Sequence, residues 1–287
     1  MYSMKKFTCN ICTEAYRKYS TIHQHNKIHT QNNEFIKQYI IFSFDELDIE
    51  YINGIPKVVY ICWFGCEKNN LPTMSINRFN AFKSLVSHIN IPIILLTYIN
   101  YNYFVKAEYP LHDGFQYLSG VHKADYFRCY MLHHYGGGYH DIKQRDIGWE
   151  NEWNTNNWTS NRNIWMYGRR EKYSGAIGYP PGKKNIQKYF NDLVTMGWII
   201  CRPNTKYTLM LLAHIELVLD KHNDALKKFP AKIPSGYYSD KPYALVPANA
   251  YPIRWLEILG EIYHPLMLTY KNHIKYGLSD ARKGRYK

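Results

Sequence analysis

The residues best suited to do chemistry lie in one stretch, 118–143, which reads LSGVHKADYFRCYMLHHYGGGYHDIK. Three successive glycines at 136–138 are followed by an acid, Asp141, and a base, Lys143. Glycines allow positive φ angles and a close approach of the backbone to a ligand, because they lack a Cβ atom. The stretch therefore predicts a ligand-binding loop with an acid and a base beside it.

Residues 1–31 contain a second group of residues that could do chemistry, in this case as metal ligands. Zinc prefers four nitrogen or sulfur ligands in a tetrahedron. The pattern C-x2-C-x12-H-x3-H supplies them from Cys9, Cys12, His25 and His29. The segment resembles a single C2H2 zinc finger with a ββα fold, and apolar residues stand at its core positions. We expect a structural Zn2+ here, and a contact to nucleic acid or to protein through the finger.

A helix is predicted at 119–135, directly before the glycines. Ser119 suits the N-cap position, because its hydroxyl can accept a hydrogen bond from the first helical turn. Asp125 and Arg128 stand three residues apart and share one helix face. Taken alone, the pair is better explained as a surface salt bridge worth less than about 1 kcal/mol.

The composition limits the kinds of protein that the chain can be. Its 287 residues, 46% of them hydrophobic, suffice for one α/β domain and a small appendage. A net charge of +13 suits an anionic ligand, whether a nucleotide diphosphate, nucleic acid or a membrane surface. No run of about 20 apolar residues predicts a membrane span. The six Cys do not indicate a disulfide scaffold, so we expect a soluble, cytoplasmic protein.

Several segments of alternating type must position these residues. A strand at 56–65, a helix at 72–88 and a strand at 91–98 form a βαβ unit. The unit predicts a Rossmann-like, mainly parallel sheet, whose ligands bind beyond the carboxyl ends of the strands. Trp63 would lie at that edge. Further along, we expect helices at 185–195, 206–229 and 253–262, a strand at 198–201, and a Trp-rich loop at 149–162 that is partly core.

The segments PKVVYICWFG, KADYFRCYMLHHYGGGY and HDIK, in this order, resemble the glycosyltransferases with a DXD sugar-binding region. That family includes initiating mannosyl- and galactosyltransferases and capsular polysaccharide enzymes. The resemblance is close over residues 55–143 and looser at 197–205 and 251–265. It implies a GT-A fold and a nucleotide-diphosphate sugar donor. It also implies transfer of a hexose to a hydroxyl of a glycan or protein, with retention at the anomeric carbon.

The same resemblance assigns the donor-binding residues. Trp63 would stack on the nucleobase. Asp125 and Arg128 would hold hydroxyls of the donor sugar and of the ribose. Gly137 and Tyr139 would also contact the donor.

Asp141 and Lys143 are the expected catalytic residues, and Lys143 departs from the family motif. Asp141 matches the first acid, but the last acid, which would ligate a divalent ion, is replaced by Lys143. An ammonium cannot ligate Mn2+ or Mg2+, which need oxygen ligands. Lys143 could neutralise the diphosphate directly. Alternatively, Asp141 could hold a metal with Asp146 or Asp240, or transfer could be lost and leave a sugar-nucleotide binder.

The predicted organisation has three parts: a zinc finger at 1–31, a linker at 32–54 and a glycosyltransferase domain at 55–287. The leading hypothesis is a soluble hexosyltransferase. The alternative is an adaptor that binds nucleic acid or protein through the finger and carries a catalytically silent sugar-nucleotide domain.

Overall fold

The computed structural model describes residues 34–65, 67–68, 71–232 and 249–280. The expected zinc finger with Cys9, Cys12, His25 and His29 therefore lies outside the described residues. The segment expected as a linker is described from residue 34 onward. Its side chains at Ile36, Ile40 and Ile41 are buried, so this part of it packs on the larger domain.

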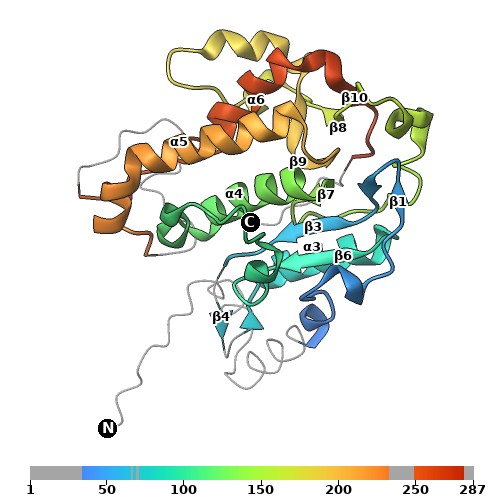
Figure 1. Cartoon of the computed structure of the whole chain (residues 1–287), viewed down its shortest axis with the longest axis horizontal. Helices are drawn as coiled ribbons and strands as arrows, with labels where there is room; N and C mark the ends of the chain where they lie inside the picture. Colours follow the sequence, from blue (N-terminus) through green and yellow to red (C-terminus); the bar gives the residue numbers. More distant parts are fainter. Residues whose placement is uncertain (1–33, 66, 69–70, 233–248, 281–287) are drawn as a thin grey trace.

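A six-stranded mixed sheet forms the centre of the described structure (Figure 1). Across the sheet the strands are β10 (Ile274–Tyr276), β8 (Met166–Arg170), β9 (Val194–Cys201), β7 (Gly137–His140), β3 (Val59–Cys62) and β6 (Ile93–Leu96). The pairs β10–β8, β7–β3 and β3–β6 are parallel, whereas β9 runs antiparallel to both β7 and β8. The predicted α/β fold with a mostly parallel sheet is confirmed.

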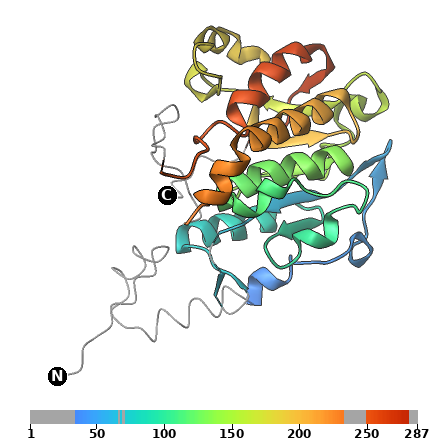
Figure 2. The ribbon, with the colours of Figure 1, turned by 60° about the vertical axis from the view of Figure 1, so that its left-hand side comes forward.

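Helices cover both faces of this sheet (Figures 1 and 2). They are α3 (Ile76–His88), α4 (Gly120–His134), α5 (Lys206–Lys228) and α6 (Gly260–Thr269). Alternate residues of β3 enter two different cores: Tyr60 and Cys62 pack with α4, α5 and α6, while Val59 and Ile61 pack with α3. Burial on both faces explains why the strand reads as a continuous apolar run. Within the described residues, no helix is long and apolar enough to span a bilayer.

Short elements connect these layers. Two small hairpins are formed by β1 (Tyr51–Ile52) with β2 (Ile55–Pro56) and by β4 (Glu67–Lys68) with β5 (Leu71–Pro72). The 3-10 helices are η1 (Phe44–Glu46), η2 (Tyr101–Phe104), η3 (Asp113–Tyr117), η4 (Thr155–Ser160), η5 (Ser174–Ala176), η6 (Lys184–Asp192) and η7 (Lys271–His273).

The second half of the chain departs from the predicted elements. The helix expected at 185–195 is the 3-10 helix η6, and β9 begins at Val194 because that residue is fully buried and pairs with Arg170 of β8. The helix expected at 253–262 begins only at Gly260, as α6. In the loop at 149–162, three tryptophans are at most 2% exposed and belong to the core that includes α3, namely Trp149, Trp153 and Trp158.

Candidate functional site

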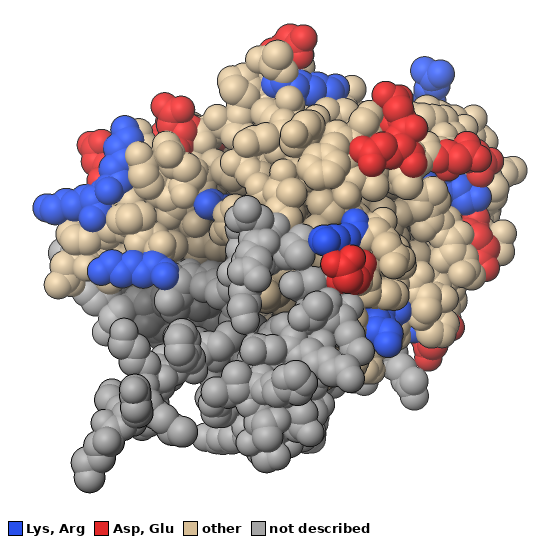
Figure 3. Space-filling model, turned by 90° about the horizontal axis from the view of Figure 1, so that it is seen from below, with Lys and Arg blue, Asp and Glu red and all other residues tan. Residues whose placement is uncertain are grey.

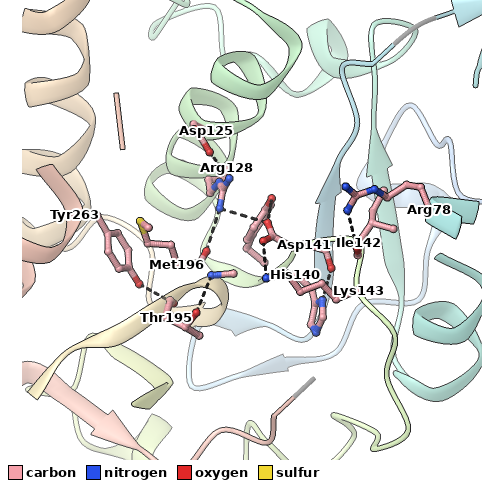
Figure 4. A network of polar contacts seen from close by, with 12 residues as sticks. Arg78, Asp125, Arg128, His140, Asp141, Ile142, Lys143, Thr195, Met196 and Tyr263 are labelled. Carbon is pink, nitrogen blue, oxygen red and sulfur yellow. Dashed lines mark hydrogen bonds and ion pairs between the residues drawn. The ribbon is translucent and has the colours of Figure 1, made fainter. Parts of the chain in front are cut away.

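The helix α4 presents an acid and a base toward the end of β7 (Figure 4). The Ser119 hydroxyl accepts a hydrogen bond from the N–H of His122 at 3.2 Å, which fixes where the helix begins. Asp125 and Arg128 then lie one turn apart, only 7% and 9% exposed. Arg128 donates to the Asp125 carboxylate and, from Nη1 at 3.0 Å, to the Met196 carbonyl oxygen of β9. The pair is therefore buried, not a surface salt bridge.

Asp141 directly follows β7, and its carboxylate meets Arg128. Its Oδ1 accepts a hydrogen bond from the Tyr139 hydroxyl at 2.9 Å and lies 3.5 Å from Arg128 Nη1. Its Oδ2 lies 3.3 Å from Lys143 Nζ. The backbone N–H of Asp141 donates to the Gly197 carbonyl oxygen at 2.7 Å, which ties this residue to β9. Both carboxylate oxygens are thus held by protein groups.

The two carboxylates differ in acidity. Burial raises the pKa of Asp125 to about 6, against the opposing effect of the neighbouring Arg128. Burial also acts to raise the pKa of Asp141, but Lys143 and Arg128 outweigh it, so that this pKa lies below its ordinary value. Asp141 therefore remains ionised at neutral pH, whereas Asp125 titrates close to it.

The strand β9 contributes residues that the sequence analysis did not single out. Lys143 Nζ lies 4.9 Å from the centroid of the Trp198 ring. A Cβ atom at Gly197 would stand 3.1 Å from both Lys143 Nζ and Asp141 Oδ2, closer than nearly all such contacts. Gly197 therefore leaves room for this ion pair. The strand predicted at 198–201 forms part of β9. The sequence pattern of a strand does not show which other strand it pairs with, so the pairing of β9 with β7 could not be predicted.

His140, the last residue of β7, is fully buried behind the ion pair. Its Nδ1 lies 2.5 Å from the Asp141 carbonyl oxygen, which can only accept, so Nδ1 carries the proton. Its Nε2 then accepts from Arg145 Nη1 at 3.3 Å. Burial and the adjacent Arg145 lower the pKa of His140 to about 3. Arg145 also donates to Ser279, so a neutral histidine and the carboxy-terminal segment both support Asp141.

The glycine run is packed against protein atoms. Gly136 and Gly137 have φ angles of +71° and +94°, which disfavour other residues. A Cβ at Gly136 would come 2.5 Å from Pro203, and one at Gly138 would come 3.0 Å from Trp149. At these positions the glycines make room for neighbouring strands and loops. The expected contact of Gly137 with a ligand stays a prediction.

Trp63 follows β3 and is partly exposed. Its indole N–H donates to the Thr73 carbonyl oxygen at 3.1 Å. The Arg78 guanidinium carbon lies 5.8 Å from the Trp63 ring centroid, and its Nη1 donates to the Ile142 carbonyl oxygen at 3.0 Å. Since Ile142 stands between Asp141 and Lys143, contacts run without a gap from Trp63 through Arg78 to the Asp-Ile-Lys segment (residues 141–143) and on to α4.

A family model for the glycosyltransferase sugar-binding region containing the DXD motif matches residues 11–165, more than half of the 287-residue chain. The chain belongs to this glycosyltransferase family. The match includes Trp63, the pair on α4 and the Asp-Ile-Lys segment, and it ends before β8 and β9. It begins within the segment expected to be a zinc finger. No curated protein and no solved structure matches the chain.

The motif that gives this glycosyltransferase family its name implies a divalent ion held by acids. Among the described residues, no group of three or more His, Cys, Asp or Glu side chains could hold a metal ion. Of the two acids considered as partners of Asp141, Asp146 is exposed and Asp240 lies outside the described residues. Asp141 itself is engaged by Lys143 and other donors. The Lys143 ammonium, 3.3 Å from Asp141 Oδ2, would repel a divalent ion placed there, so the described donor set does not fit Mg2+ or Mn2+.

Proposed function

We propose that the chain transfers a hexose from a nucleotide-diphosphate sugar to a hydroxyl group of a glycan or protein. The supporting observation is that Asp125, Arg128, Asp141 and Lys143 converge beyond the carboxyl end of β7. Because β7 and β3 are parallel, Trp63 beyond β3 lies at the same edge of the sheet. Ligands of such sheets bind at this edge. Membership of the glycosyltransferase family supports the same function.

The donor would extend along the line of contacts from Trp63 to α4. Trp63 would stack on the nucleobase, since an indole offers a large flat surface. Asp125 would accept hydrogen bonds from sugar hydroxyls, and Arg128 would hold that carboxylate in place while donating to the sugar side. Tyr139 would act through its hydrogen bond to Asp141. We propose that this arrangement holds the donor without Mn2+ or Mg2+.

In the proposed reaction, the bond between the anomeric carbon and the diphosphate oxygen breaks, and the nucleoside diphosphate leaves with the electron pair. The acceptor hydroxyl oxygen forms the new bond to the anomeric carbon, and its proton passes to the departing diphosphate. Lys143 would stabilise the negative charge on that leaving group, and Asp141 would position Lys143. Retention at the anomeric carbon is the outcome that the family resemblance implies.

The test is the release of nucleoside diphosphate from UDP-hexoses and GDP-mannose. Wild type is expected to hydrolyse one of these donors slowly, as transferases do when water replaces the acceptor. Asp141→Asn should reduce this rate by roughly 100-fold or more, because Lys143 loses its charged partner. Asp113→Asn, at an exposed acid of η3, is the matched control and should keep the rate. Absence of both turnover and binding for every donor would contradict the proposal.

The zinc finger is a separate proposal, carried by the spacing of Cys9, Cys12, His25 and His29. On the face in Figure 3, described Lys and Arg side chains are spread among acidic and neutral ones, and no continuous basic surface for nucleic acid is visible there. We propose that the finger contacts a protein and brings the transferase to its acceptor, with nucleic acid as the alternative partner. Bound zinc in wild type, reduced in Cys12→Ser, would support the site; zinc-free wild type would contradict it.

A further inference from the structure

Arg78 lies between Trp63, on which the nucleobase is proposed to stack, and the Asp-Ile-Lys segment. No sequence motif indicated this residue. It lies in the first turn of α3, where Ser75 caps the helix and accepts a hydrogen bond from the Arg78 N–H at 3.3 Å. Its guanidinium reaches Ile142 of the Asp-Ile-Lys segment at 3.0 Å while lying 5.8 Å from the Trp63 ring centroid. A rigid helix end thus holds a cation at this position.

Lys143, the last residue of this segment, provides a second cation (Figure 4). Its Nζ is 3.3 Å from Asp141 Oδ2 and 4.9 Å from the Trp198 ring centroid, and its side chain is 22% exposed. The ammonium is therefore partly open to solvent. Together, Arg78 and Lys143 flank Ile142 from two separate elements.

We propose that Arg78 and Lys143 bind the diphosphate of the donor together, without a divalent cation. This inference rests on the proposed function. If the nucleobase stacks on Trp63 and the sugar contacts Asp125, the diphosphate that joins them must cross the Asp-Ile-Lys segment. Arg78 contacts this segment at Ile142, and Lys143 is its last residue. Arg128 also contacts Asp141, but its guanidinium is held by Asp125 and the Met196 carbonyl oxygen.

The charges of the site support this assignment. When the Lys143 ammonium turns from Asp141 Oδ2 toward a phosphate oxygen, Asp141 Oδ1 still contacts Arg128 and accepts the hydrogen bond from the Tyr139 hydroxyl. The carboxylate is then still compensated, so the movement leaves no unpaired buried charge. A divalent ion placed at Oδ2 would instead meet the ammonium at short range and be repelled. Two monovalent cations match the two negative charges of a diphosphate diester.

The experiment is calorimetric titration of the full chain with uridine, guanosine, adenosine, cytidine and thymidine diphosphates. Each is measured in buffer freed of divalent ions, without chelator in the cell so that bound zinc is kept, and again with added Mn2+. Wild type is expected to bind one of them without Mn2+, and added Mn2+ should change its affinity by less than about twofold.

Variants separate the two cations from general effects of charge. Arg78→Gln and Lys143→Asp should each weaken metal-free binding by roughly 10- to 100-fold, the effect of losing one charge-assisted contact. Lys143→Arg should restore most of the affinity. Lys143→Asp should also gain affinity when Mn2+ is added, because it places two acids around Ile142. The matched controls are the exposed positions Arg162→Gln and Lys184→Asp, which should bind as wild type does.

The possible failures are distinguishable. If wild type binds a nucleoside diphosphate only with Mn2+, the inference is overturned while the proposed function stands. If no nucleoside diphosphate binds in either buffer, the proposed function fails, and the inference fails with it. If binding is metal-free but Arg78→Gln retains wild-type affinity, Arg78 is not a ligand of the diphosphate. Thermal unfolding of each variant checks that a loss of binding is not a loss of fold.

Discussion

Two acid–base pairs meet at this site, and they are built differently. Asp125 and Arg128 lie on one helix, and their side chains are only 10% and 11% exposed. Asp141 and Lys143 flank Ile142 beyond a strand, and their side chains are 30% and 22% exposed. The helical pair also holds β9 through the Met196 carbonyl oxygen, whereas Lys143 contacts β9 through the Trp198 ring.

The difference indicates a division of roles between the pairs. Burial raises the pKa of Asp125 to about 6, so this carboxylate depends on Arg128 for its charge. The pKa of Asp141 lies below its ordinary value despite burial, because Lys143 and Arg128 both favour its ionised form. In the proposed function, the helical pair would belong to the rigid part of the site that faces the sugar. The pair around Ile142 would supply the cation that we propose binds the phosphates.

Removal of Arg128, the basic member of the helical pair, should have the largest effect on the stability of the fold. Arg128→Ala leaves Asp125 buried without its partner, which is expected to reduce the free energy of unfolding by about 3–5 kcal/mol. Urea unfolding followed by circular dichroism measures this, with Arg162→Ala as the exposed control. A loss below about 1 kcal/mol would show that the buried pair has no architectural role.

Removal of the Lys143 ammonium should weaken donor binding and leave the stability of the fold nearly unchanged. Lys143→Ala is expected to change the free energy of unfolding by less than about 1 kcal/mol, because the ion pair is partly exposed. Affinity for the nucleotide sugar should fall by roughly 10- to 100-fold. Unfolding and calorimetry on the same sample decide this. A Lys143→Ala protein that is strongly destabilised would remove the distinction between the two pairs.

The pH dependence of donor binding should follow the helical acid. Asp125 gains a proton as the pH falls through about 6, and a neutral carboxyl accepts sugar hydroxyl hydrogen bonds less well. Affinity for a nucleotide sugar is therefore expected to fall roughly tenfold between about pH 7 and pH 5. Asp141, with its lowered pKa, remains ionised over this range.

The control for this prediction is Asp125→Asn, whose binding should be weaker and nearly independent of pH in that range. The ligand must be a nucleotide sugar, because the terminal phosphate of a free nucleoside diphosphate itself titrates near neutrality. A pH profile that is the same in wild type and in Asp125→Asn would contradict the assignment.

The smallest expected effect comes from β9. In Gly197→Ala, the new Cβ would stand 3.1 Å from Lys143 Nζ and Asp141 Oδ2, so the ion pair must shift by a few tenths of an ångström. We expect affinity for the donor to fall by about two- to fivefold, less than one order of magnitude and thus less than about 1.4 kcal/mol. Gly175→Ala, where the nearest atom is 3.4 Å away, is the control. Equal affinities in all three proteins would show that the ion pair tolerates displacement.

Local signals in the sequence were enough for one half of this site. The cap at Ser119 and the i, i+3 spacing of Asp125 and Arg128 placed both side chains correctly on one helix face. The closeness of Asp141 and Lys143 follows from their separation by one residue. The apolar runs predicted β3 and β6, because strands buried on both faces contain few polar residues.

The other half depends on contacts between distant segments. Gly197 and Trp198 reach Asp141 and Lys143 only because β9 inserts antiparallel between β7 and β8. Arg78 reaches the Asp-Ile-Lys segment only through the packing of α3. No residue spacing encodes such pairings, and the burial of Asp125 and Arg128 was missed for the same reason. The close packing of Gly136 and Gly138 against Pro203 and Trp149 could not be predicted either, because it joins segments that are distant in the sequence.

The most direct measurement is a crystal structure of the chain with a bound nucleotide sugar. The predicted result has the nucleobase on Trp63, phosphate oxygens within hydrogen-bond distance of Arg78 and Lys143, and sugar hydroxyls at Asp125. No divalent ion lies between Asp141 and the phosphates in that result. A nucleotide sugar bound away from the Asp-Ile-Lys segment, or one joined to Asp141 through a metal ion, would contradict it.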